Sequence, residues 1–149
     1  VITFYSAQRD RIFKELEKYD ISERGEEGWR VRTEYAASPD CPERLRVGTV
    51  DSFQGKEFDV VFLSAVRSNT QRLGPRDDAE SEEAFDKAAS RKYGHLRSSN
   101  RLNVAMSRQR RLLVAVGDRV MFTGAAARDA VPEMSAFLDL CDEEVRRVS

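Results

Sequence analysis

The sequence predicts an α/β fold with a mainly parallel sheet and helices on both faces, and three observations support this prediction. Apolar β-branched runs alternate with segments of helical period, which is the pattern of strand–helix–strand units. Two of the runs, Val47 to Val50 and Val60 to Leu63, are almost continuously apolar and so predict strands that are buried on both faces. The 149 residues, 40% of them hydrophobic, suit one globular domain that buries most of its surface.

The expected elements follow one another in chain order. The strands are expected at Val1 to Tyr5, Val47 to Val50, Val60 to Leu63 and Leu112 to Val116. The helices are expected from about Ala7 to Tyr19, with Ser6 as N-cap, from about Ser98 to Arg110, and from Pro132 onward. Residues 22–44, which are rich in charge, Gly and Pro, predict a surface connection with a short strand around Trp29 to Thr33.

Residues 70–94 predict an insertion between the third strand and the second helix. They carry an acidic cluster around an expected short helix: Asp77, Asp78, Glu80, Glu82, Glu83 and Asp86. Charge runs of this kind are usually solvated, so we expect a surface segment here in preference to a regulatory element. The whole chain, residues 1–149, is expected to be one domain that includes this insertion.

Composition excludes several classes of protein. A net charge of −1 excludes a uniformly basic nucleic-acid binder, so any such surface is local. Cys41 and Cys141 lie far apart and His95 is the only histidine, which predicts neither a metal site nor a disulfide framework. No apolar run approaches the roughly 18 residues that span a bilayer, so we expect a soluble cytoplasmic protein without membrane contacts.

Because the chain starts inside a strand at Val1, we expect it to be a piece of a longer polypeptide.

A polar turn, residues 49–57, separates two of the apolar runs and holds the first candidate site. Gly55 permits a phosphate to approach the backbone closely, and Glu57 can accept hydrogen bonds from ribose hydroxyls. Thr49 and Ser52 can donate hydrogen bonds to a nucleic-acid backbone. An ordinary strand end followed by a helix cap explains the Thr-Val-Asp-Ser sequence equally well.

A basic segment near the second helix is the other candidate site. Its seven cations are Arg91, Lys92, Arg97, Arg101, Arg108, Arg110 and Arg111. On a continuous helix Arg101 and Arg108, seven residues apart, project from the same face. Guanidinium groups bind phosphate in a bidentate manner and keep their charge, which favours anion recognition. The alternative, arginines that are solvated or paired with the acidic insertion, stays open.

Three segments resemble the motifs of a known enzyme family. Residues 47–67, Val-Gly-Thr-Val-Asp-Ser-Phe-Gln-Gly-Lys-Glu-Phe-Asp-Val-Val-Phe-Leu-Ser-Ala-Val-Arg, resemble motif V of superfamily 1 helicases, in the branch that includes the nonsense-mediated-decay helicase. Residues 100–110, Asn-Arg-Leu-Asn-Val-Ala-Met-Ser-Arg-Gln-Arg, resemble motif VI of that branch. Residues 1–8, Val-Ile-Thr-Phe-Tyr-Ser-Ala-Gln, are similar to motif IV. The resemblance implies the second RecA-like domain of such a helicase, a three-layer fold like that of P-loop NTPases.

The resemblance also implies roles at an ATP site. Arg108 corresponds to the arginine finger that reaches the γ-phosphate, and Gly55 and Glu57 to contacts with the γ-phosphate and ribose. Arg101 and Arg110 are weaker candidates for phosphate contacts or for bracing the finger. ATP and Mg²⁺ are the implied cofactors of the complete protein.

On the nucleic-acid side, the resemblance assigns Thr49 and Ser52 to the backbone of single-stranded DNA or RNA, and Gln54 to coupling between the two sites. Phe4, Asn100 and Gln109 depart from the family pattern, and only position 100 loses a candidate role by this. The resemblance suggests movement from 5′ to 3′. Backbone contacts do not distinguish DNA from RNA.

The sequence contains no GxxxxGK[ST] loop, the phosphate-binding loop of P-loop enzymes. We therefore expect an N-terminal RecA-like domain of the same polypeptide to supply the Mg²⁺ and β-phosphate ligands. The isolated chain is expected to hydrolyse no ATP and to bind no cofactor tightly. The alternative is a non-enzymatic module that uses the same fold to bind nucleic acid or a protein partner, with strongly salt-dependent affinity.

Overall fold

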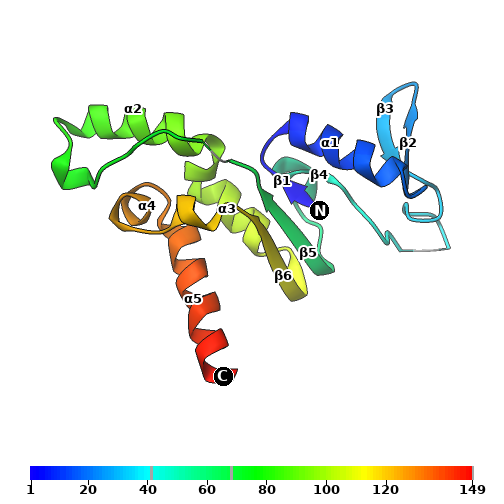
Figure 1. Ribbon diagram of the computed structural model, residues 1–149. Helices are drawn as coiled ribbons and strands as arrows, with labels where there is room; N and C mark the ends of the chain where they lie inside the picture. The colour runs from blue at the N-terminus through cyan, green and yellow to red at the C-terminus, as the bar shows by residue number, and fades with distance from the viewer. Residues whose placement is uncertain (41, 68, 149) are drawn as a thin grey trace. The chain divides into compact units, whose positions relative to one another are not determined.

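The structure is a computed structural model that describes residues 1–40, 42–67 and 69–148, with side chains up to residue 143 of the last helix. Residues Val1–Ser64 and Val104–Val116 form one compact unit, unit 1, and residues 65–103 and 117 onward form a second, unit 2. The two units are described separately below, and Figure 1 labels their helices and strands.

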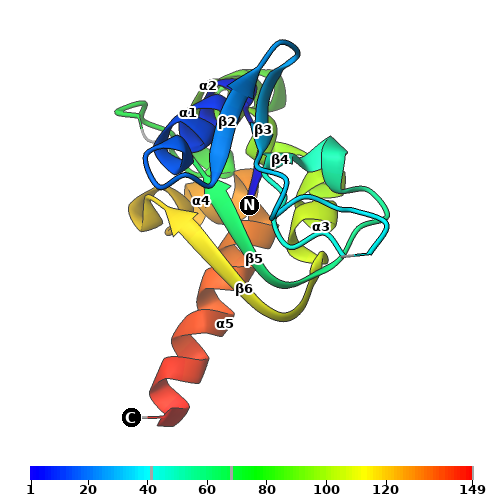
Figure 2. The ribbon, with the colours of Figure 1, turned by 90° about the vertical axis from the view of Figure 1, so that its right-hand side faces the viewer.

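The sheet belongs to unit 1 and is mainly parallel, which confirms the predicted fold class. Its four strands lie in the order β4-β1-β5-β6. They are β4 (Gly48–Thr49), β1 (Ile2–Thr3), β5 (Phe58–Ala65) and β6 (Gln109–Gly117). The central strand β1 is parallel to both β4 and β5, with Ile2 opposite Gly48 on one side and Leu63 on the other. Figure 2 shows β6 running beside β5 in the same direction.

Helix α1 (Ser6–Glu17) follows β1 and packs beside the sheet. The backbone carbonyl of Tyr5 accepts hydrogen bonds from the amides of Gln8 and Arg9, so Tyr5 is the N-cap residue. The prediction that Ser6 caps this helix is therefore wrong by one residue, because Ser6 already has helical geometry. Phe13 is the buried residue of the helix.

A two-stranded hairpin replaces the single short strand that was predicted around Trp29 to Thr33. It consists of β2 (Ser22–Gly25) and β3 (Gly28–Val31), which pair in antiparallel fashion. The hairpin packs on α1: the Ser22 hydroxyl donates a hydrogen bond to the Phe13 carbonyl at 2.6 Å. The ring of Trp29 lies parallel to that of Phe13, with centroids 6.2 Å apart.

Strand β5 alternates between buried and exposed side chains. Val61 and Leu63 are buried, whereas Val60 and Phe62 are each 46% exposed. The prediction of a strand buried on both faces is wrong at Val60 and Phe62. Successive side chains of a strand point to opposite faces, and the described residues cover only one of the two faces of β5 fully.

Unit 2 is mostly helical and contains the acidic insertion. Its elements are η2 (Arg76–Asp78), α2 (Glu82–Tyr93), η3 (Gly94–Arg97), most of α3 (Ser99–Met106), η4 (Arg119–Phe122), α4 (Ala125–Ala130) and α5 (Pro132–Val148). The helix expected in the insertion is present as α2, and α5 begins at Pro132 as predicted. Phe85, Tyr93 and Phe122 lie in the core of this unit. The Tyr93 hydroxyl donates a hydrogen bond to the Met121 carbonyl at 2.9 Å.

Helix α3 ends at Met106, and β6 begins at Gln109. The helix predicted to reach Arg110 is therefore four residues too long, and Arg108 lies in the connection to β6. The expected single helical face with both Arg101 and Arg108 does not exist. Cys141 is exposed, and Cys41 lies outside the described residues.

Candidate functional site

The polar turn contains a short 3-10 helix, η1 (Val50–Phe53), which starts directly after β4. Val50 and Phe53 are buried, and the Phe53 ring meets the Phe58 ring edge-on, with centroids 5.9 Å apart. Ser52 turns back, so that its hydroxyl donates a hydrogen bond to the Thr49 carbonyl at 2.7 Å. Thr49 and Ser52, the two residues predicted to contact the nucleic-acid backbone, thus lie close together. The buried side chains of Val50 and Phe53 hold this turn in place.

Gly48 permits this close packing of the turn. A Cβ atom at position 48 would lie 2.0 Å from Ser52 Oγ and 3.3 Å from the Phe53 ring. The first distance does not occur for real Cβ atoms and the second is tighter than usual, so a larger residue at position 48 would force the Ser52 side chain to move.

Gly55 follows η1 with a φ of +73°, a conformation that glycine adopts without strain. An added Cβ would have no atom within 4 Å, so the space above this backbone is open. Gln54 is exposed just before it and ends the 3-10 helix. The backbone of the turn is therefore accessible to a phosphate at Gly55, which is what the predicted γ-phosphate contact requires.

Arg108 lies next to the turn because its backbone is bonded to the start of β5. Its carbonyl accepts a hydrogen bond from the Phe58 amide at 2.9 Å. Its side chain folds back on the end of α3: Nε donates to the Val104 carbonyl at 3.0 Å and Nη2 to the Ser107 hydroxyl at 2.8 Å. The guanidinium is thus held by neutral acceptors, which leave its charge uncompensated at these contacts.

Glu57 and Arg110 form an ion pair beside Arg108. Arg110 Nε lies 3.3 Å from Glu57 Oε2, and Arg110 Nη1 lies 4.0 Å from Asp59 Oδ1. All three side chains are more than half exposed and line a hollow of about 450 Å³. Asp59 was not among the predicted site residues; its signal was the alternating acidic pattern Glu-Phe-Asp at the start of a strand.

Arg101 is the remaining predicted ATP-site residue. It belongs to unit 2, where its Nη1 lies 3.2 Å from His95 Nδ1. Four of the five predicted ATP-site residues, Gly55, Glu57, Arg108 and Arg110, belong to unit 1. The unit 1 residues provide charged side chains and an open backbone at Gly55.

A second hollow, of about 420 Å³, adjoins the other side of the polar turn. It is lined by Thr49 and Ser52 together with Arg24, Trp29 and Arg46. Arg46 Nη1 donates a hydrogen bond to the Ser52 carbonyl at 3.1 Å and so braces the turn. These three additional residues escaped the sequence prediction, because they lie in the charged connection before the polar turn.

Neither a metal site nor a membrane segment is found in the described part of the chain. No three His, Cys, Asp or Glu side chains there are grouped so as to hold a metal ion. Among the same residues, no helix combines the length and the apolar character that crossing a bilayer requires.

The fold and the polar turn define a RecA-like α/β domain, and comparison with known proteins identifies its family. A family model described as an AAA domain matches residues 1–120. The putative helicase MOV-10 of Gallus gallus is 34% identical over 108 residues, which are 72% of this chain and 9% of that protein. The DNA polymerase alpha-associated DNA helicase A of Saccharomyces cerevisiae is 43% identical over 74 residues, 50% of this chain and 8% of that protein.

A third relative, the probable RNA helicase armi of Drosophila melanogaster, is 37% identical over 73 residues, which are 49% of this chain and 5% of that protein. The chain belongs to this AAA domain family, within the branch of superfamily 1 helicases that its motifs resemble. It spans less than a tenth of the length of each of these three relatives.

Proposed function

We propose that this chain is the second RecA-like domain of an ATP-dependent DNA or RNA helicase. It supplies an arginine finger, part of the ATP site and part of the single-strand surface. One observation supports this proposal: the Phe58 amide donates a hydrogen bond to the Arg108 carbonyl, which holds Arg108 next to the end of the polar turn at Glu57. Phe58 of motif V and Arg108 of motif VI, 50 residues apart in the sequence, are thereby brought together.

On the ATP side, Arg108 stabilises the charge that develops on the transferred phosphoryl group. Its present acceptors, the Val104 carbonyl and the Ser107 hydroxyl, are neutral and are readily exchanged for a phosphate oxygen. Gly55 offers its open backbone to the same phosphate, and Glu57 accepts from the ribose. Arg110 braces Glu57 through their ion pair.

ATP and Mg²⁺ complete the site in the whole protein. Arg108 and the open backbone at Gly55 suit phosphate oxygens. No three His, Cys, Asp or Glu side chains of the described residues are grouped so as to hold a metal ion. We assign the Mg²⁺ ligands and the β-phosphate contacts to an N-terminal RecA-like domain of the same polypeptide.

On the strand side, Thr49 and Ser52 contact the sugar–phosphate backbone. Thr49 precedes η1, Ser52 belongs to it and Gly55 follows it closely, and the buried residues Val50 and Phe53 make η1 stiff. A displacement of the nucleic-acid strand at Ser52 therefore shifts Gln54 and Gly55 together with it. This is the physical basis on which Gln54 couples the two sites.

Replacing Arg108 tests the proposal. In the complete polypeptide, Arg108→Ala should lower nucleic-acid-stimulated ATP hydrolysis by about 10³–10⁵-fold, because the phosphoryl charge loses its stabilisation. Single-strand affinity should change less than about threefold, since Arg108 lies on the ATP side. Arg108→Lys should also be impaired, because lysine keeps the charge but lacks the planar fork.

Arg128→Ala is the matched control, since it removes an exposed arginine whose partner is Asp139 on α5. It should leave phosphate release unchanged. Turnover at the wild-type rate in Arg108→Ala would remove the finger assignment and would favour the non-enzymatic nucleic-acid-binding module.

A further inference from the structure

We propose that the β2–β3 hairpin extends the single-strand track, and that Trp29 and Arg24 hold one nucleotide of the strand, by base stacking and by a phosphate contact. This inference rests on the proposed function, since it continues the path of the strand beyond Thr49 and Ser52. Nothing in the motifs of the family assigns these two residues.

The hairpin presents Arg24 and Trp29 on one face. They are opposite each other in the antiparallel ladder, as are Glu23 and Arg30, the next pair along. Because side chains alternate along a strand, the two pairs point to opposite faces. Arg30 is bonded to Glu23 on the outer face, with Nη2 2.7 Å from Oε1.

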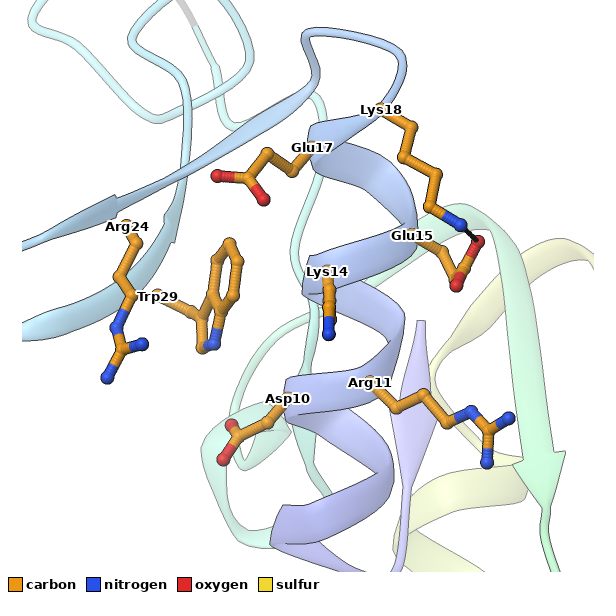
Figure 3. Close-up of a pocket in the computed structure, with 8 residues that line it drawn as sticks. All are labelled: Asp10, Arg11, Lys14, Glu15, Glu17, Lys18, Arg24 and Trp29. Atoms are coloured by element: carbon orange, nitrogen blue, oxygen red, sulfur yellow. Dashed lines mark hydrogen bonds and ion pairs between the residues drawn. The ribbon is translucent and has the colours of Figure 1, made fainter.

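The inner face is fixed on α1 by the packing described above, in which Phe13 supports one side of the Trp29 ring system. Figure 3 shows the indole between the hairpin and α1, with Arg24 on the adjacent strand. An aromatic ring that is held in this way loses little conformational entropy when a base stacks on it.

One hollow joins this hairpin face to the polar turn. Trp29 and Arg24 line it together with Thr49, Ser52 and Arg46. Its volume of about 420 Å³ is within the range of sites that hold small organic groups. A strand whose backbone lies at Thr49 and Ser52 therefore has space for its next nucleotide against the indole.

Three arginines line the hollow, together with the carboxylates of Asp10 and Glu27, and Arg24 is the arginine that has no ion pair among the described residues. Arg9 is paired with Asp10 at 2.7 Å, and Arg46 with Glu43 at 2.9 Å. Arg24 is exposed and has no ion pair or hydrogen bond to another side chain of the described residues. A phosphate is the group that an exposed guanidinium beside a base-stacking ring recognises best.

The two residues also face α1. Trp29 and Arg24 line a further hollow on the other side, together with Lys14. Figure 3 shows Lys14 on the face of α1 that is turned toward Trp29. The proposed path of the nucleic acid runs from Ser52 over Trp29. Because Asp10, Glu15 and Glu17 line the hollow beside Lys14 as well, Arg24 is the group that we assign to the phosphate.

Trp29 is the only tryptophan of the chain, so its fluorescence reports this contact directly. The experiment titrates a labelled oligothymidylate of about 15 nucleotides into the chain and records anisotropy and tryptophan emission in parallel. We expect the emission to be quenched with the same midpoint as the anisotropy rise. An abasic deoxyribose-phosphate strand should bind without quenching, because it has no base to stack.

Variants test the two residues separately. Trp29→Leu should weaken binding by about 5- to 100-fold. Arg24→Gln should weaken binding and lower the slope of log affinity against log salt by about 1. Arg30→Gln removes the same charge from the outer face of the same hairpin and should leave the slope unchanged. The CD spectrum of each variant shows that it is folded.

The outcomes separate this inference from the proposed function. Binding by anisotropy with unchanged tryptophan emission overturns the hairpin proposal and leaves the proposed function intact. The same holds if Arg24→Gln behaves like Arg30→Gln while Thr49→Ala weakens binding. Absence of any anisotropy change would instead contradict the nucleic-acid part of the proposed function itself.

Discussion

Gly48 is the residue on which the geometry of the polar turn depends most directly. In Gly48→Ala the new methyl group would collide with Ser52 Oγ, so Ser52 must rotate and lose its hydrogen bond to Thr49. We expect a loss of about 1–3 kcal/mol in the free energy of unfolding. Urea denaturation measures this change.

Gly74→Ala is the control for that prediction. The nearest neighbour of a Cβ at position 74 would be the Asp78 side chain at 3.9 Å, which is ordinary contact. Its stability should stay within about 0.5 kcal/mol of the wild type. If the two variants were equally stable, the tight packing at Gly48 would not matter.

At the residue scale the sequence indicated the residues of the polar turn but not the residues that lie beside it. Phe53 is buried and holds the turn in place. Arg24 and Trp29 could not be foreseen as neighbours of Thr49, because about 20 residues separate them in the chain. Only the packing of the hairpin on Phe13 brings them to the same hollow.

Among the elements, α2 is anchored at its end by Tyr93, whose hydroxyl reaches the Met121 carbonyl in η4. Burial raises the pKa of Tyr93 above its usual value of 10. The folded state therefore holds the phenol proton more tightly than the unfolded state. Its contribution to stability is complete below about pH 10 and is lost as pH rises through the raised pKa.

Tyr93→Phe tests this anchor. The variant should lose about 1 kcal/mol at neutral pH, the usual contribution of one hydrogen bond. Between about pH 9 and 11 its stability should fall less steeply than that of the wild type. Tyr19→Phe, at a side chain that is 75% exposed, should reproduce the wild-type pH profile. Parallel profiles for Tyr93→Phe and wild type would contradict the assignment.

The observed ends of the helices and strands show where tertiary contacts override the local preference of the sequence. The helical pattern of residues 100–110 continues past Met106, yet the bond between Arg108 and Phe58 draws the next residues into the sheet. The hairpin has a local signal: Gly25 and Gly28 bracket a two-residue turn, and Gly28 has a φ of +115°. The end of α3 thus depends on a partner distant in the sequence, whereas the strands of the hairpin pair with each other.

For the molecule as a whole, the absence of a phosphate-binding loop from the sequence leads to a simple prediction. The chain alone should release no phosphate from ATP above the background, with or without single-stranded DNA or RNA. A phosphate-release assay measures this. Turnover that Arg108→Ala abolishes would show that the chain is a complete enzyme by itself.

The fold class and family were predictable from the sequence because three motifs occur in the right order along residues 1–110, and the family match confirms them. What covers each face of the sheet was not predictable. Val60 and Phe62 are as apolar as Val61 and Leu63, but only the latter are buried. Apolar character indicates that a strand face can be buried, whereas the neighbouring elements determine whether it is.

The ion pair of Arg110 has a consequence for how the site accepts a ligand. Arg110 lies near two carboxylates, Glu57 at 3.3 Å and Asp59 at 4.0 Å, which alternate along the chain. If a ribose hydroxyl bound Glu57, as proposed, the Arg110 guanidinium could shift toward Asp59 and keep a carboxylate beside it. The two alternating carboxylates would thus let Arg110 change partner as the site fills.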